Sequence, residues 1–436
     1  MFDQMFDQNF WSGLAGWVIA GGAALFVLFA LRLILRMWRA SARRARLIRG
    51  PRPKGPIVFL NARMGVAPAI MGPTRPTPEG YRLACLFFGA GLIDRTGVLD
   101  HGFDAALLDP APDAPERGDP ARKKEMATLL SERAAELRRL SETRRAPVRL
   151  FWSGGIDSTA AACALLDAFI DAPRRLEIVH TAASEREYPL FYKRYVVTHP
   201  THRRVANIRS ALAGDAILCT GEHGDQLFGS LKARRLRWSA LQAPWERSLP
   251  PILARQLGGG TRADAMLRYL EPQIRACPIP LPRLFDLLWW WNFSMKWQAV
   301  SLRLFADGTE ASWAARDRAA HFYRSEAFQL WSLSHPDERI KGNWKTYKWP
   351  LKEAIRAFTR DDRYFARKEK EPSLRGGLGA RDPAHKGLAL AVTADGGFYF
   401  REFDDSLRSD GGEGGGFSFS YSGERRLWRD LEDDGE

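Results

Sequence analysis

Residues 148–159 read VRLFWSGGIDST. The apolar run from Val148 to Trp152 is typical of a buried strand, and the two glycines after it allow a tight turn into a helix. Such a turn also occurs without a ligand, but consecutive amides at a helix start bind phosphate, and Asp157 supplies a carboxylate that Mg²⁺ prefers. Because a Walker A lysine is absent, backbone amides and hydroxyl groups would hold the anion. The candidate phosphate-binding residues are Ser153, Gly154, Gly155, Asp157, Ser158 and Thr159.

The segments around this turn alternate between strand and helix patterns. Further strands are expected at residues 176–181, 195–198 and 216–220, and helices at 158–172 and 185–193. Such alternation predicts βαβ units and a mainly parallel sheet, with ligands at the carboxyl ends of its strands. Before the sheet, an apolar stripe from Met126 to Leu140 at helical spacing predicts an amphipathic helix. After it, the pattern is helical, and the tryptophan-rich run at 287–293 is typical of a buried core helix.

A second motif follows the strand that is expected at 216–220. Residues 220–229 read TGEHGDQLFG, in which Glu222 and Asp225 lie three residues apart among glycines. Paired carboxylates at a strand end suit metal binding or proton transfer, although acids at a helix start also stabilise the helix dipole. We therefore take Asp157 and Asp225 as candidate metal ligands.

The two motifs together, S-G-G-x-D-S and T-G-E-x-G-D-x-L-F-G, resemble the synthetase domain of asparagine synthetase, in the PP-loop ATP-pyrophosphatase group. Residues 184–188 (SEREY) are similar to an acidic E-x-E-Y helix start of that family. Residues 347–354 (YKWPLKEA) are similar to its late K-x-x-L-R-E-A helix. The resemblance covers roughly residues 121–375 and implies a PP-loop sheet with a helical C-terminal half.

This resemblance implies adenylation: ATP and Mg²⁺ would activate a carboxylate as an acyl-AMP with release of pyrophosphate, and ammonia or an amine would then displace AMP. Glu222 would act near the activated carboxylate. A late lysine would reach the reaction centre, with Lys370 as the first choice and Lys368 as the alternate. The residues that would line the adenosine site are Phe151, Val179, Thr220 and Gly221.

The sequence departs from the family in three places. It begins with Met1-Phe2 instead of the catalytic cysteine of a glutaminase domain, and residues 57–120 are short for such a domain. Gln226 stands where the family has Glu, and the usual G-G-Y is Gly229-Ser230-Leu231. We therefore expect no glutamine hydrolysis by the chain itself. Ammonia, a substrate amine or a separate amidotransferase partner would supply nitrogen, and the carboxylate substrate stays open.

The N-terminal region carries a candidate membrane anchor. Residues 9–31 contain 23 residues without a charge, and a helix of that length crosses a hydrocarbon core of roughly 30 Å. Acids precede this segment and seven arginines follow it up to Arg49, which is the reverse of a cleaved signal peptide. A buried soluble helix is the alternative. The positive-inside rule places the N-terminus outside and the large C-terminal part in the cytoplasm.

Charge and cysteine content narrow the class of protein. The formal net charge is +14, and residues 51–400 carry +15 once the basic N-terminus (+5) and the acidic end from 401 (−6) are separated. This charge favours anionic ligands without choosing among them. Four scattered cysteines in 436 residues exclude a disulfide scaffold and suit a reducing compartment.

The predicted organisation runs from an extracytoplasmic tip to a flexible acidic tail. Two other functions stay open: a different PP-loop enzyme that modifies a nucleobase or tRNA, and a nucleotide-binding pseudoenzyme that acts as a membrane scaffold. Nucleic acid is not expected as a partner. The boundaries are 1–8 for the tip, 9–37 for the transmembrane helix and its basic stop, 38–56 for a basic linker rich in Pro and Gly, 57–120 for a small region of undetermined structure, 121–386 for the synthetase-like domain, and 387–436 for a hairpin and the tail.

Overall fold

The computed structural model describes residues 55–61, 77–116, 124–229, 233–368 and 388–402, together with parts of 29–48. In these parts of the chain, no helix is both long enough and apolar enough to cross a membrane. The apolar segment 9–31 lies outside the described residues apart from Phe29, as do the tip, Lys370 and the acidic tail.

A four-stranded parallel sheet confirms the expected α/β class. Its strands are β2 (Val148–Phe151), β3 (Leu176–His180), β4 (His202–Arg204) and β5 (Ile217–Thr220), in the order β4-β3-β2-β5. Every neighbouring pair is parallel. Strands β2, β3 and β5 are mostly apolar and buried, as in a sheet that is covered on both faces.

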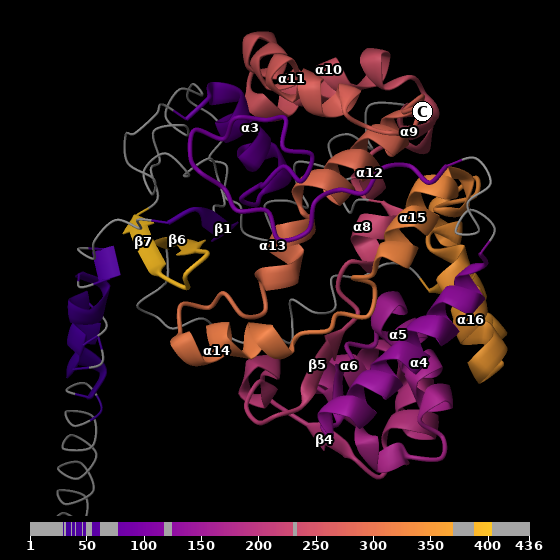
Figure 1. Ribbon diagram of the computed structural model, residues 1–436. Helices are drawn as coiled ribbons and strands as arrows, with labels where there is room; N and C mark the ends of the chain where they lie inside the picture. The colour runs from indigo at the N-terminus through magenta and orange to yellow at the C-terminus, as the bar shows by residue number, and fades with distance from the viewer. Residues whose placement is uncertain are drawn as a thin grey trace, which may run out of the picture.

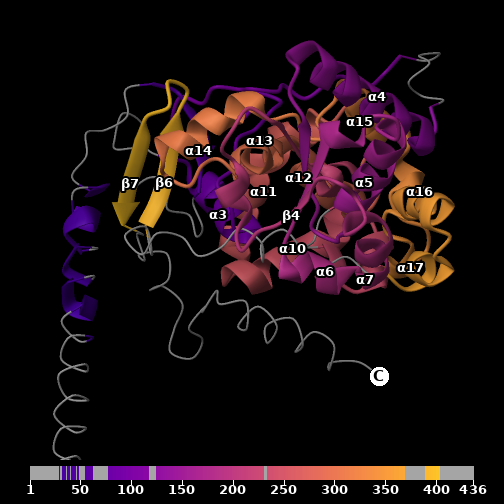
Figure 2. The same cartoon turned by 90° about the horizontal axis from the view of Figure 1, so that it is seen from below.

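Helices α4 (Met126–Arg144) and α5 (Ile156–Ala168) pack beside this sheet together with α16 (Trp349–Thr359), which comes much later in the chain. Figures 1 and 2 both show them on one side of the molecule. The amphipathic helix expected before the sheet is confirmed as α4. Its buried apolar side chains are Met126, Leu129, Leu130, Ala134 and Leu137.

The prediction of a strand at residues 195–198 is wrong. The chain there continues α6 (Ala182–Glu187) and α7 (Pro189–Phe191) as a π-helical segment over Tyr192–Val196, and the next strand is β4. Aromatic and β-branched residues favour a strand, but tertiary packing overrides this preference. The ring of Tyr195 packs 5.0 Å from that of Phe191, which is one helical turn earlier.

The C-terminal half is helical, as expected. Its central helix, α12 (Leu284–Met295), is buried along its whole length, which confirms the tryptophan-rich run as core. The other helices of this half are α8 (Gly224–Phe228), α9 (Trp238–Gln242), α10 (Trp245–Leu257), α11 (Gly260–Arg275), α13 (Trp297–Leu302), α14 (Glu310–Ala314), α15 (Glu326–Ser334) and α17 (Asp362–Arg367).

A second sheet joins segments from the two ends of the chain. Strand β1 (Ile57–Leu60) pairs antiparallel with β6 (Leu388–Thr393), which pairs antiparallel with β7 (Phe398–Glu402). Figure 2 shows β6 and β7 at the far side of the molecule from α16. Val58, Leu390 and Phe151 belong to one buried apolar cluster, so this sheet packs toward the parallel one. Among the described residues of 57–120, helix α3 (Glu79–Phe88) packs on α11.

One further segment, residues 319–323, lies along the free side of β5 and is called here the edge segment. Ala319 bridges Leu218 in parallel, and the amide of Ala320 donates to the carbonyl of Leu218 over 2.8 Å. The amide of Phe322 donates to the carbonyl of Thr220 over 3.0 Å. The edge segment therefore extends the sheet next to the strand that carries the second motif.

Candidate functional site

The first motif forms a turn between β2 and the start of α5. The amide of Ser153 donates to Ser158 Oγ over 3.1 Å, and the two hydroxyl groups lie 2.9 Å apart. Gly154 has a φ of +80°, and a Cβ there would lie 2.6 Å from the carbonyl oxygen of Ser184, so only glycine fits. Thr159 is fully buried and its hydroxyl accepts from the indole of Trp152. The structure thus brings Ser153 and Ser158 together and places the Thr159 hydroxyl inside the core.

The second motif packs directly against the first. A Cβ at Gly221 would lie 2.6 Å from the backbone nitrogen of Ser158, and one at Gly224 would lie 2.3 Å from Asp157 Oδ1. Both glycines therefore allow a close approach that any side chain would block. The motif starts at the end of β5, and its Asp225 lies in the first turn of α8.

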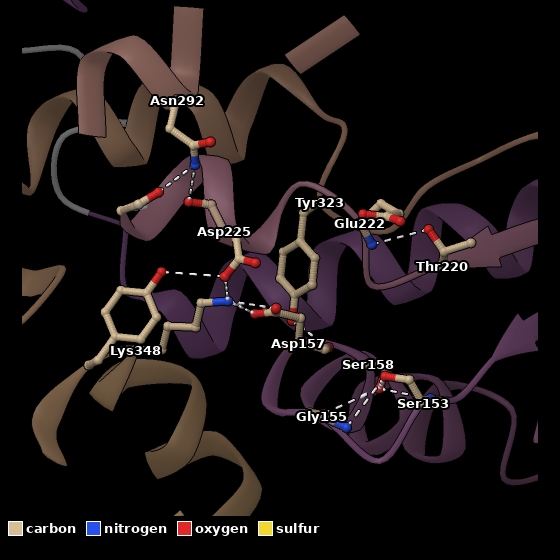
Figure 3. A network of polar contacts seen from close by, with 12 residues as sticks. Ser153, Gly155, Asp157, Ser158, Thr220, Glu222, Asp225, Asn292, Tyr323 and Lys348 are labelled. Atoms are coloured by element: carbon tan, nitrogen blue, oxygen red, sulfur yellow. Dashed lines mark hydrogen bonds and ion pairs between the residues drawn. The ribbon is translucent and has the colours of Figure 1, made fainter. Parts of the chain in front are cut away.

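Asp157 and Asp225 converge on the side chain of Lys348 (Figure 3). Lys348 Nζ lies 2.5 Å from each carboxylate oxygen of Asp157 and 2.7 Å from Asp225 Oδ1, and its side chain is 0% exposed. The Tyr347 hydroxyl is 3.4 Å from Asp225 Oδ1, and burial followed by the charge of Asp225 raises the pKa of Tyr347. Lys348 precedes α16 with a φ of +59°. Two carboxylates and one ammonium thus share one small buried volume.

The two aspartates supply carboxylate oxygens, the type of ligand that a divalent cation prefers. Carboxylate oxygens from Asp157 and Asp225 aim at one point, as Mg²⁺ sites of phosphate-binding proteins require. Among the described residues, no group of three His, Cys, Asp or Glu side chains could hold a metal ion. The protein therefore offers a partial ligand set, and the ammonium of Lys348 already neutralises part of its charge.

Glu222 lies on the other side of the second motif and is tied to Arg303. Arg303 Nε donates to Glu222 Oε1 over 2.8 Å, and its Nη2 donates to Oε2. Burial lowers the pKa of Arg303, but the Glu222 carboxylate outweighs it, and the pKa of Arg303 lies above its ordinary value. The Glu222 side chain is 5% exposed and that of Arg303 34%. The pair fixes the orientation of the Glu222 carboxylate.

The residues proposed for adenosine lie side by side at the carboxyl ends of three strands. Phe151 is in register with Val179 of β3 and with Thr220 of β5. All three are fully buried, and Phe151 and Val179 belong to the apolar cluster under the second sheet. The structure thus groups them next to Gly221 without exposing their side chains.

Of the two candidate late lysines, the structure describes Lys368. Its Nζ lies 3.0 Å from Glu187 Oε1, and both side chains are at least nine-tenths buried. A Cβ on Gly154 would lie 2.8 Å from Glu187 Cβ, so this ion pair borders the turn of the first motif. The late segment therefore reaches the first motif, while Lys370 lies outside the described residues.

Sequence reasoning missed two charged residues of this site. Lys348 belongs to the late helix motif but had no assigned role, and Arg303 had no motif at all. A buried lysine requires a carboxylate partner, which is the signal that could have identified Lys348 once the two aspartates were paired. Arg303 carries no comparable local signal.

No protein-family model matches this chain, and no curated protein matches it either. The class of the molecule is thus defined by what the structure shows. It is an α/β protein with a parallel sheet, at whose strand ends two acidic motifs converge on a buried lysine.

Proposed function

We propose that this chain is an ATP-dependent amide-forming ligase that resembles the synthetase domain of asparagine synthetase and has the PP-loop type of sheet. The convergence of Asp157 and Asp225 on Lys348 is the observation that carries the proposal. Two separate motifs that predict one phosphate and metal site from sequence lie in direct contact through Gly221 and Gly224. A stability role alone would not require such a pair of motifs at the ligand-binding edge of a parallel sheet.

In the proposed reaction, a carboxylate oxygen of the substrate attacks the α-phosphorus of ATP, and pyrophosphate leaves. Ammonia or an amine then attacks the acyl carbon, and AMP leaves with the oxygen that bridged the two groups. The turn at Ser153–Ser158 and the Lys348 ammonium bind the phosphates, and stabilise the charge that develops on pyrophosphate. Glu222 orients the incoming amine near the acyl carbon. Bound Mg²⁺ would add a positive charge on the phosphate oxygens.

A test of this function is the exchange of labelled pyrophosphate into ATP by the full-length chain, screened against a panel of carboxylic acids. We expect exchange that depends on one class of acid and on Mg²⁺, because adenylation is reversible before the amine attacks. Exchange with no acid of the panel would count against the ligase. With glutamine as the only nitrogen source, we expect no release of glutamate, whereas ammonium should support turnover.

The nucleobase or tRNA modification alternative receives no support from the cysteines. Burial raises the pKa of the Cys85 and Cys219 thiols to about 12, so neither is a thiolate at neutral pH. Cys163 is also buried and its pKa is raised. The scaffold alternative has one observation in its favour, since Lys348 already fills the point on which the aspartates converge. It predicts ATP binding without acid-dependent exchange.

The proposed enzyme is attached to the membrane by residues 9–37, with its N-terminus outside and its catalytic domain in the cytoplasm. The basic cluster that follows the apolar run supports this orientation. A reporter enzyme that folds only in the cytoplasm should be active when it is fused after Glu436. Activity on the opposite side of the membrane would contradict both the orientation and the access to cellular ATP.

A further inference from the structure

The edge segment (residues 319–323) contacts both motifs of the candidate site, although sequence reasoning gave it no role. It is bonded to β5 through the carbonyls of Leu218 and Thr220, so its position relative to the strand ends is fixed by the sheet. From α4, Arg133 donates to the carbonyls of His321 and Phe322, which holds the segment from its other side. Side chains on this segment can therefore act as rigid supports.

Tyr323 supports the first motif. Its hydroxyl donates to the backbone carbonyl of Asp157 over 2.9 Å, and Figure 3 shows the ring beside the carboxylate and lysine cluster. Tyr323 is fully buried and packs on Phe322 and Phe328. Because Asp157 lies in the first turn of α5, this bond fixes the start of the helix at which its carboxylate projects.

His321 supports the second motif through a chain of hydrogen bonds with a defined direction. His321 Nε2 lies 2.9 Å from the carbonyl of Ser301, which can only accept, so Nε2 carries the proton and Nδ1 is the acceptor. The Thr220 hydroxyl then donates to Nδ1 over 2.7 Å, and the Thr220 oxygen accepts from the amide of Glu222 over 3.1 Å. Burial lowers the pKa of His321 to about 4, which agrees with a neutral ring.

We propose that His321 and Tyr323 are positioning residues that hold Glu222 and Asp157 in one fixed relative arrangement. The inference rests on the proposed function, because it assigns these residues to the site of that reaction. The role differs from general packing because each side chain makes a hydrogen bond to one motif: Tyr323 to the Asp157 carbonyl and His321 to the Thr220 hydroxyl. Each residue acts through a bond to one motif, so its loss should slow the reaction more than it weakens folding.

The test compares two pairs of matched variants in the full-length chain. Tyr323→Phe removes one hydroxyl, and Tyr81→Phe is its control, since Tyr81 is equally buried and donates to the carbonyl of Leu92 far from the motifs. His321→Leu removes the acceptor of Thr220. His101→Leu is its control, because the buried His101 accepts from the amide of Asp94.

Acid-dependent AMP formation, MgATP affinity by calorimetry and melting temperature are measured on each variant. We expect Tyr323→Phe and His321→Leu to lower kcat by on the order of tenfold or more with little change in the KM for the acid, at melting temperatures equal to those of their controls. His321→Asn, which keeps an acceptor near Thr220, should recover part of kcat. Variants that match their controls in both turnover and MgATP affinity would overturn the inference.

A failure of the proposed function can be distinguished from a failure of this inference. If the unmodified chain forms no AMP with any acid, the ligase assignment is wrong, and MgATP affinity alone then decides the inference. Weaker MgATP binding in Tyr323→Phe than in Tyr81→Phe would still support a positioning role at the first motif. Equal affinities would contradict it.

Discussion

We expect Asp157→Asn and Asp225→Asn each to lower acid-dependent pyrophosphate exchange by about a hundredfold or more. Each change removes a carboxylate that would hold the Mg²⁺ beside the departing pyrophosphate, and losing one stabiliser of developing charge typically costs about 3 kcal/mol. It also takes away a partner of the buried Lys348 ammonium. Initial exchange rates at saturating ATP and Mg²⁺ measure the effect.

The matched control is Asp167→Asn, an exposed aspartate on the same helix as Asp157. The Asp167→Asn protein should catalyse pyrophosphate exchange at the rate of the unmodified chain. Melting temperatures separate a loss of chemistry from a loss of folding. If both Asp157→Asn and Asp225→Asn retained full exchange, the two motifs would have no catalytic role, and the scaffold function would be favoured.

We expect Lys348→Met to destabilise the fold and to make its stability depend on Mg²⁺. The substitution leaves two buried carboxylates side by side without a counter-charge, and breaking a buried ion pair in this way costs about 3–5 kcal/mol. A divalent cation can replace the lost charge because both carboxylates aim at one point. We therefore expect a large fall in melting temperature that millimolar Mg²⁺ partly reverses. A chelator should cancel this effect of Mg²⁺.

Lys352→Met is the matched control for this experiment. Lys352 is also buried and lies one turn later on α16, but its Nζ donates to the carbonyl of Lys345, away from the carboxylates. Its melting temperature should not respond to Mg²⁺. A Lys348→Met protein as stable as the unmodified chain, with no response to Mg²⁺, would show that Asp157 and Asp225 do not form a cation site.

The sequence predicts those site residues that directly follow strands of the parallel sheet. Asp157 and Asp225 follow β2 and β5, which are neighbours in the sheet, so recognising two strands was enough to bring them together. The same alternation predicted the parallel sheet, and the tryptophan-rich run at 287–293 predicted the core helix α12. The strand expected at 195–198 failed because packing of Val196 and Tyr195 on the core decides the local structure there.

The part that sequence could not predict comes from distant segments. Lys348 is 191 residues from Asp157, and Arg303 is 81 residues from Glu222. Their positions depend on how the helical half folds back over the strand ends, and no local periodicity encodes that path. The edge segment is missed for a similar reason, because its alignment with β5 depends on a pairing between residues about a hundred positions apart.

We propose that the carboxylate is activated as an acyl-adenylate, and the fate of its oxygen atoms tests this most directly. An acid that supports exchange is labelled with ¹⁸O in its carboxylate and incubated with the enzyme, MgATP and ammonium. If an acyl-adenylate forms, we expect one labelled oxygen in AMP and none in pyrophosphate. Formation of ADP with labelled phosphate, or consumption of ATP without transfer of the label, would contradict it.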